Sequence, residues 1–193
     1  MKQRLNKPQH GFSLLEGLIA VAIIMTVMGM ALINYSTILP NYKANTAMDQ
    51  VLSQLRSARE RAISHRIEVQ VQFVGTNQMT LTEIWFVGAA PPPTTVTFEG
   101  GAKYMVFAAA PVVPDTPMGF GNNAAIYFGG VNGGPPIMKF TSNGSFIDGG
   151  NTLVNGTVFL GMTGKPSTAR AVTVLGATGR VRAYHYDGAQ WQE

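Results

Sequence analysis

A single acidic residue, Glu16, lies inside the most apolar stretch of the chain. Residues 12–33 read FSLLEGLIAVAIIMTVMGMALI, and Glu16 carries the only formal charge among them. A carboxylate within a lipid-facing helix costs roughly 3 kcal/mol near the bilayer centre and usually has a charged partner. Glu16 therefore either extends its carboxylate to the membrane interface or pairs with a positive group of another molecule.

Two arginines near the C-terminus, Arg180 and Arg182, have the spacing of a phosphate-binding pair. Residues two positions apart on a β-strand project from the same face, and two adjacent guanidinium groups match phosphate oxygens. Further candidates are the cations of the adjoining hairpin and the tyrosines that continue the same face: Lys165, Arg170, Tyr184 and Tyr186. An arginine pair on a terminal strand also suits docking to a neighbouring protein subunit, so both interpretations remain open.

The sequence lacks the residue patterns of common catalytic, metal and nucleotide sites. It contains no G-x-S-x-G motif and no cysteine, and Ser145 has no histidine near it in the chain. The three histidines, His10, His65 and His185, lack the spacing of metal ligands. The aspartates form no calcium-loop pattern, and residues 176–179 lack the lysine of a phosphate-binding loop. We therefore expect no enzyme activity, no cofactor and no metal.

Length and charge indicate one globular head behind a basic N-terminal segment. The chain has 193 residues, of which 46% are hydrophobic and 12% charged, so disorder is not expected. Three cations, Lys2, Arg4 and Lys7, account for most of the net charge of +4. From Ile67 onward six basic residues face seven acidic ones, so any nucleic-acid contact would be a local patch.

The apolar stretch 12–33 is long enough to cross a bilayer as a helix. At about 1.5 Å per residue it spans the ~30 Å hydrocarbon core. The cations that precede it predict a cytoplasmic N-terminus and a head outside the cytoplasm. A secretory signal would end at a small-residue cleavage site after the apolar run, and the sequence has none before helix-compatible residues resume. We therefore expect the segment to remain as a membrane anchor.

An amphipathic helix is predicted for residues 40–66 and a β-rich head for residues 67–193. Apolar residues recur at helical spacing in the first of these segments, and Pro40 predicts a kink where the two helical halves meet. The period then changes to two, beginning with Val69, Val71 and Phe73. Further predicted strands are 79–87, 94–98, 104–109, 124–128, 137–141, 157–162, 171–175 and 180–186. Residues 88–93 and 111–123 are rich in Pro and Gly and are predicted to be surface loops.

The N-terminus resembles the class III signal of type IV prepilins and type II secretion pseudopilins. The resemblance lies in GFSLLE at positions 11–16, after a basic leader that ends in PQH. It implies that prepilin peptidase cuts between Gly11 and Phe12, that leader 1–11 is released, and that Phe12 is N-methylated. Helix 12–39 would remain as the membrane and polymerisation helix. Glu16 would then pair with the terminal ammonium of Phe12 in a neighbouring subunit, inside a low-dielectric filament core.

The helix after Pro40 and the C-terminal third resemble the H-type pseudopilin and FimT/FimU-type minor pilin branch of this family. The match covers the helical motif from Leu52 to Ile63 and the strand succession from 139 to 182, but not the loops of 88–123. It implies an α+β, pilin-like fold, in which a long N-terminal helix packs on an antiparallel β-sheet head. FimT-type minor pilins of naturally transformable bacteria carry a similar G-R-x-R motif and bind DNA through it.

Two filament roles follow from the resemblance. The first is a minor type IV pilin that joins other pilins in a priming or tip complex, with DNA binding for uptake as an additional hypothesis. Its DNA-contacting residues would be Lys165, Arg170, Arg180 and Arg182. The alternative is the H-type pseudopilin of a type II secretion system. In both roles the chain lies in the bacterial inner membrane with a periplasmic head before assembly, and in a pilus or pseudopilus afterwards.

Overall fold

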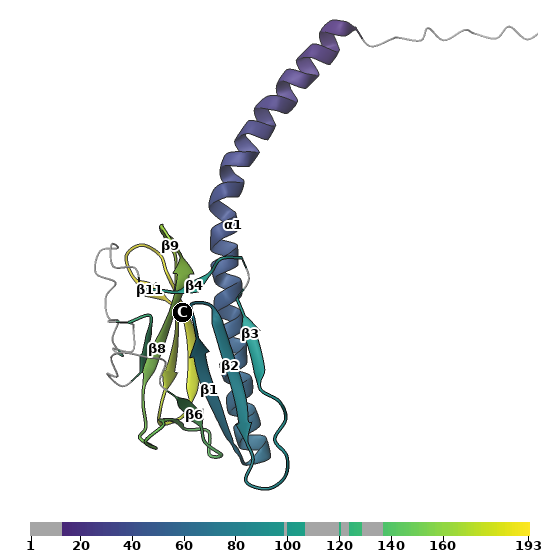
Figure 1. Cartoon of the computed structure of the whole chain (residues 1–193). Coiled ribbons are helices and arrows are strands. Elements are labelled where there is room, and N and C mark those ends of the chain that lie inside the picture. The colour runs from purple at the N-terminus through teal and green to yellow at the C-terminus, as the bar shows by residue number, and fades with distance from the viewer. Residues whose placement is uncertain (1–12, 99, 107–119, 121–123, 129–136) are drawn as a thin grey trace, which may run out of the picture. The chain divides into compact units, whose positions relative to one another are not determined.

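The computed structural model describes residues 13–98, 100–106, 120, 124–128 and 137–193 (Figure 1). Tertiary contacts divide the chain into two units, Met1–Leu39 and Pro40–Glu193, which we describe separately. One helix, α1 (Leu14–His65), contributes residues to both units and contains Pro40. The backbone is helical on both sides of this proline, and the kink there stays a prediction.

In the first unit, α1 is an apolar helix whose side chains from Leu14 to Ala31 are exposed. The stretch Leu14–Ala31 is long and apolar enough to cross a membrane, and none of it is buried within the protein. Large side chains such as Leu18, Ile24 and Met28 are more than half exposed. So much exposed apolar surface is stable only in lipid or against other apolar helices.

Strands of the second unit form two antiparallel sheets. In spatial order, the first sheet contains β3 (Thr94–Thr97), β2 (Gln78–Ile84), β1 (Glu68–Val74), β6 (Met138–Phe140) and β7 (Phe146–Asp148). The second contains β11 (Trp191–Gln192), β10 (Arg180–Tyr186), β9 (Lys165–Leu175), β8 (Gly156–Met162) and β4 (Lys103–Tyr104). Strand β5 (Ile126–Phe128) also pairs with β8, at residues that precede those paired with β4.

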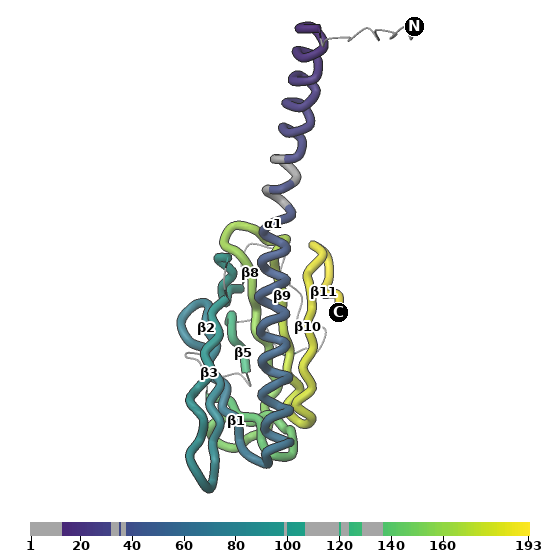
Figure 2. Tube along the Cα trace, turned by 90° about the vertical axis from the view of Figure 1, so that its right-hand side faces the viewer, coloured from purple at the N-terminus to yellow at the C-terminus, as the bar shows by residue number. Residues whose placement is uncertain are grey.

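The part of α1 in the second unit packs on both sheets and joins them in one core (Figure 2). Its buried residues recur every three or four positions: Ala44, Ala47, Val51, Leu55, Ala58 and Ala62. Four of these six are alanines, whose short side chains let the helix approach the strands closely. The core side chains opposite them include Val71, Phe73 and Phe140 from the first sheet and Leu160, Val172 and Val174 from the second. The predicted fold of a helix packed on an antiparallel β-sheet head is confirmed.

Strand boundaries differ from the prediction where the apolar pattern is weak. Strands β7 and β11 were not predicted, because three and two residues are too few to show a period. Strand β9 begins at Lys165 rather than at residue 171, because hairpin pairing with β8 extends it through a polar segment. The predicted loop 88–93 lies outside the strands and is exposed, whereas the predicted loop 111–123 falls almost wholly outside the described residues.

Two glycines allow the β9–β10 turn and the β6–β7 turn to meet beside α1. Gly179 has φ of +60°, and a Cβ atom there would lie 2.0 Å from the carbonyl oxygen of Gly144. Gly144 has φ of +83°, and its Cβ would lie 2.8 Å from Cδ1 of Ile63. Arg59 joins both turns to the helix, since its Nε donates to the carbonyl oxygens of Thr178 at 3.0 Å and of Gly144 at 3.3 Å. The glycine of the G-R-V-R segment thus has a packing role.

A buried arginine, Arg170, ties the second sheet to α1. Its Nε donates to Oδ1 of Asn45 at 2.6 Å, and its Nη2 to Oδ1 of Asn41 at 3.4 Å. Its Nη1 donates to the carbonyl oxygens of Ala169 at 2.8 Å and Ser167 at 3.0 Å. Only 6% of the residue is exposed, and burial lowers the pKa of its guanidinium. Removing this side chain would leave several acceptors without donors.

We predict that Gly179→Ala destabilises the head much more than Gly75→Ala. Both glycines have φ of +60°, so both variants carry the left-handed strain of about 1–2 kcal/mol. No atom lies within 4 Å of a Cβ at Gly75, whereas a Cβ at Gly179 meets backbone and should cost roughly 1–3 kcal/mol more. Thermal unfolding of the full chain in detergent micelles, followed by near-ultraviolet circular dichroism, measures the difference. Equal midpoints for the two variants would contradict the close approach of the two turns.

We also predict that Arg170→Gln lowers the free energy of unfolding by about 2 kcal/mol or more, because acceptors on α1 and β9 lose a charged donor. Arg180→Gln is the matched control, since Arg180 is exposed and should change stability by less than about 0.5 kcal/mol. Chemical denaturation of both variants in micelles tests this. A wild-type midpoint for Arg170→Gln would show that the hydrogen bonds to α1 contribute no net stability.

Candidate functional site

Glu16 lies in the first turn of α1, whereas Gly11 and Phe12 fall outside the described residues. The Oγ atom of Ser13 accepts a hydrogen bond from the backbone N–H of Glu16 at 3.2 Å, and the carbonyl oxygen of Ser13 accepts one from Gly17 at 3.2 Å. Ser13 is therefore the N-cap, and Glu16 is the third helical residue. This S-x-x-E spacing is that of a capping box, a signal that our sequence analysis missed.

The carboxylate of Glu16 has no ion-pair partner in the part of the chain that the structure describes. A negative charge in the first turn gains about 0.3–1 kcal/mol from the helix dipole. That gain is smaller than the roughly 3 kcal/mol that a carboxylate costs near the bilayer centre. Capping alone therefore does not offset a charge held at that depth, and both a carboxylate at the membrane interface and a positive partner from another molecule stay predictions for Glu16.

Arg180 and Arg182 lie on the same face of β10, as their spacing predicts. Val181 between them points into the core beneath α1, so the two arginines point away from it. The Nη1 atom of Arg182 lies 2.9 Å from a carboxylate oxygen of Glu193, and its side chain is only 27% exposed. Arg180 is exposed, and its guanidinium has no hydrogen bond to any described residue. The pair therefore offers one free guanidinium and one that is already paired.

The other two candidate cations do not join this pair. Arg170 is buried and bonds to α1, on the face of the sheet opposite to Arg182. Lys165 is exposed at the start of β9, in the turn that follows β8. The tyrosines that continue the face, Tyr184 and Tyr186, are buried in a cluster with Phe159 and Trp191. The four predicted cations therefore do not form one surface, and a role in DNA binding stays a prediction for each of them.

The three histidines are separated. His10 lies outside the described residues, His65 ends α1 with its ring 5.8 Å from that of Trp85, and His185 is exposed on β10. Among the residues that the structure describes, no group of three His, Asp or Glu side chains lies close enough to hold a metal ion.

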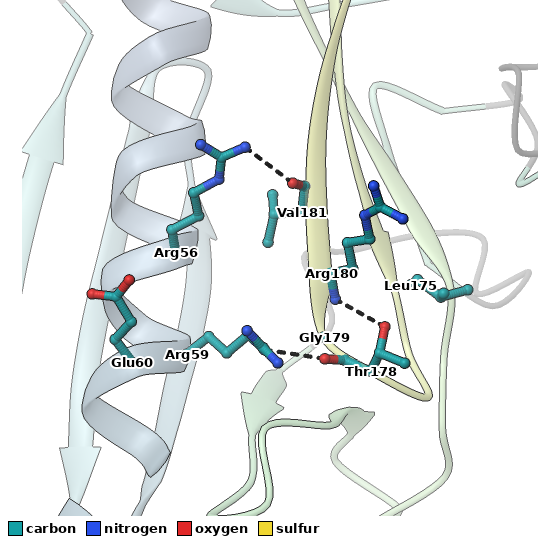
Figure 3. Close-up of a pocket in the computed structure, with 8 residues that line it drawn as sticks. All are labelled: Arg56, Arg59, Glu60, Leu175, Thr178, Gly179, Arg180 and Val181. Carbon is teal, nitrogen blue, oxygen red and sulfur yellow. Dashed lines mark hydrogen bonds between the residues drawn. The ribbon is translucent and has the colours of Figure 1, made fainter. Parts of the chain in front are cut away.

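A cavity of about 560 Å³ between α1 and the β9–β10 turn was not predicted from the sequence (Figure 3). Its lining includes three polar residues of α1, the last residue of the β9–β10 turn and the first two residues of β10: Arg56, Arg59, Glu60, Gly179, Arg180 and Val181. The α1 residues and the hairpin residues are more than 100 positions apart in the sequence, so only the fold brings them together. The apolar spacing of α1 leaves these polar residues off its buried face, but it does not say which strand they approach.

Comparison with known proteins identifies the N-terminal segment. Residues 6–32 match the family model described as the prokaryotic N-terminal methylation motif. No curated protein matches the chain significantly.

Among solved structures, the chain is similar to a minor pilin and a minor pseudopilin. One is the type IV minor pilin FimU of Pseudomonas aeruginosa, with a TM-score of 0.48 and 14% identity over 79% of this chain and 94% of that one. A second crystal form of FimU has a TM-score of 0.46 and 15% identity over 77% of this chain and 97% of that one. The other is the minor pseudopilin EpsH from the Type 2 Secretion System of Vibrio cholerae, with a TM-score of 0.48 and 14% identity over 74% of this chain and 97% of that one.

The methylation motif includes the predicted cleavage site, Phe12 and Glu16, and it runs into the exposed apolar part of α1. The rest of the chain forms the predicted helix-on-sheet head. The N-terminal methylation motif at residues 6–32 thus supports the predicted relation of this chain to type IV pilins and pseudopilins.

Proposed function

We propose that the chain is a minor subunit of a type IV pilus, processed by prepilin peptidase and assembled through α1. The peptidase would remove residues 1–11, and Phe12 would become the methylated N-terminus. Other pilins would be its partners, in a complex that primes or caps the filament. The head carries no catalytic role in this proposal, and its surface serves contacts with neighbouring subunits.

The observation that carries the proposal is Glu16, which has no ion-pair partner within residues 13–193 as far as they are described, in an exposed apolar helix that bears the methylation motif. A bilayer covers the apolar side chains but supplies no cation at this depth. In a filament, the α1 helices of neighbouring subunits cover the same side chains, and the new ammonium of a neighbour's Phe12 neutralises Glu16. Pairing removes two unfavourable charges at once and would fix the axial register between subunits.

The N-terminal segment also supports a proposal for where the chain lies before assembly. The cations Lys2, Arg4 and Lys7 would hold the unprocessed N-terminus in the cytoplasm, and Leu14–Ala31 would span the inner membrane. Residues from Pro40 onward would then fold in the periplasm. After processing, the chain would leave the membrane along α1 and enter the filament.

An H-type pseudopilin of a type II secretion system is the second candidate. It would need the same cleavage site, the same Glu16 and the same helix-on-sheet head, so these features favour neither role. Neighbouring genes separate the two, as does a deletion strain that loses either its pili or its secreted proteins.

DNA binding is an additional proposal for the pilus role. The exposed guanidinium of Arg180 favours it, because this side chain is available to a phosphate. Arg182 on the same face would need to exchange Glu193 for a phosphate. Lys165 is exposed and could add a separate contact, whereas the buried Arg170 is already bonded to α1.

We predict that Gly11→Val leaves an uncut precursor in the inner membrane. A branched side chain before the cut would obstruct the approach of the peptidase to the backbone. Gly17→Val is the matched control, since a Cβ at Gly17 meets no atom within 4 Å and the residue lies beyond the cut. Mass spectrometry of the membrane-bound protein gives the result. Normal loss of residues 1–11 from Gly11→Val would exclude the prepilin assignment.

We further predict that Glu16→Gln is processed normally but enters filaments poorly. Glutamine can serve the capping box as glutamate does, so this variant keeps the cap and removes the charge. Ser13→Ala is the complementary variant, which removes the cap and keeps the charge. Immunoblots of sheared pili and of membranes measure both. If Glu16→Gln assembles like the wild type while Ser13→Ala does not, Glu16 acts as a capping residue and the charge-pairing role fails.

A further inference from the structure

The cavity beside the β9–β10 turn is crossed by two arginines of α1 (Figure 3). The Nη2 atom of Arg56 donates to the carbonyl oxygen of Val181 at 3.4 Å, and Nε of Arg59 donates to that of Thr178 at 3.0 Å. Both side chains therefore extend from the helix toward the hairpin. Because backbone hydrogen bonds hold them there, their guanidinium groups are positioned before any ligand arrives.

Neither arginine has a carboxylate partner among the described residues. The ion pairs in that part of the chain are Arg61–Glu83, Lys139–Glu68 and Arg182–Glu193. A guanidinium has several N–H donors, and the hydrogen bonds to Val181 and Thr178 use only a part of them. Both arginines line the cavity, so an anion there would lie near two positive groups with N–H donors to spare.

The surroundings favour an acidic side chain of a protein over a nucleic acid. The side chain of Val181, which lies between β10 and α1, gives the cavity an apolar wall that suits the methylene groups of an aspartate or glutamate. Glu60 lies at the same cavity and would repel the successive phosphates of a polyanion. Figure 3 shows the guanidinium of Arg180 on the side of β10 away from α1, so Arg180 would not extend this site along a nucleic-acid backbone.

We infer that this cavity binds an acidic side chain presented by a peptide segment of a neighbouring filament subunit. The inference rests on the proposed role in a filament and assigns one contact surface within it. Arg56 supplies the main charge-assisted hydrogen bond, because its backbone contact is the longer one and is readily exchanged. Arg59 adds positive charge while it holds the two turns together.

Peptide binding by the unassembled full chain in nonionic detergent micelles tests the site. The probe is a fluorescein-labelled peptide rich in glutamate, and its counterpart has glutamine at the same positions. Fluorescence anisotropy should show binding of the glutamate peptide alone. Arg56→Gln should weaken this binding about tenfold. Glu60→Gln should strengthen it about two- to threefold by removing a like charge. Lys103→Gln, an exposed cation on β4 outside the cavity, should leave it unchanged.

Arg56→Gln and Glu60→Gln are expected to change peptide binding in opposite directions, so each tests the cavity independently. Glu60 makes no hydrogen bond or ion pair to any described residue, so Glu60→Gln reports on the cavity even if Arg56→Gln unfolds. Equal affinity for the two peptides, or unchanged binding in both variants, overturns the inference. It is also overturned if duplex DNA, and not the glutamate peptide, binds and loses affinity in Arg56→Gln. Because no filament forms in this assay, its failure leaves the role of Glu16 in assembly untouched.

Discussion

The close packing of an alanine-rich helix face against two sheets is the contact on which the head depends. Neither sheet buries its inner face alone, because the core side chains of both meet at the same stripe of α1. Small residues at positions such as Ala47, Ala58 and Ala62 bring the helix near enough for valines and phenylalanines to fill the space. A helix with larger residues there would separate the sheets and open the core.

Polar contacts then fix where the helix lies along the sheets. Apolar packing is not directional, so it defines a distance better than a register. Arg170 bonds from β9 to asparagines of α1, and Arg59 bonds from α1 to the turns at Gly144 and Thr178. These bonds lie toward opposite ends of the helical segment, so together they specify its register. The same requirement explains why two guanidinium groups border the cavity beside β10.

The N-terminal unit, unlike the head, does not bury its apolar side chains within the chain. Its apolar side chains remain exposed within the chain, so its stable environments are a bilayer and a bundle of like helices. In the proposed role Glu16 would distinguish between these environments, because only a bundle of subunits would supply the ammonium of a neighbouring chain. Its charge would then favour transfer of the subunit from membrane to filament.

Sequence alone determined the long apolar helix, the methylation motif, the helix-on-sheet fold and most strands, because each depends on local periodicity or on a short contiguous motif. It did not reveal strands β7 and β11, which are too short to show a period. Nor did it show that Arg170 is buried and Arg180 exposed, since alternation along a strand does not say which face another element covers. Only the tertiary structure decided that Arg170 is buried against α1, that Gly179 permits a backbone contact, and that Arg56 faces the β10 backbone. These relations join residues more than 30 positions apart, and folding, not spacing, brings them together.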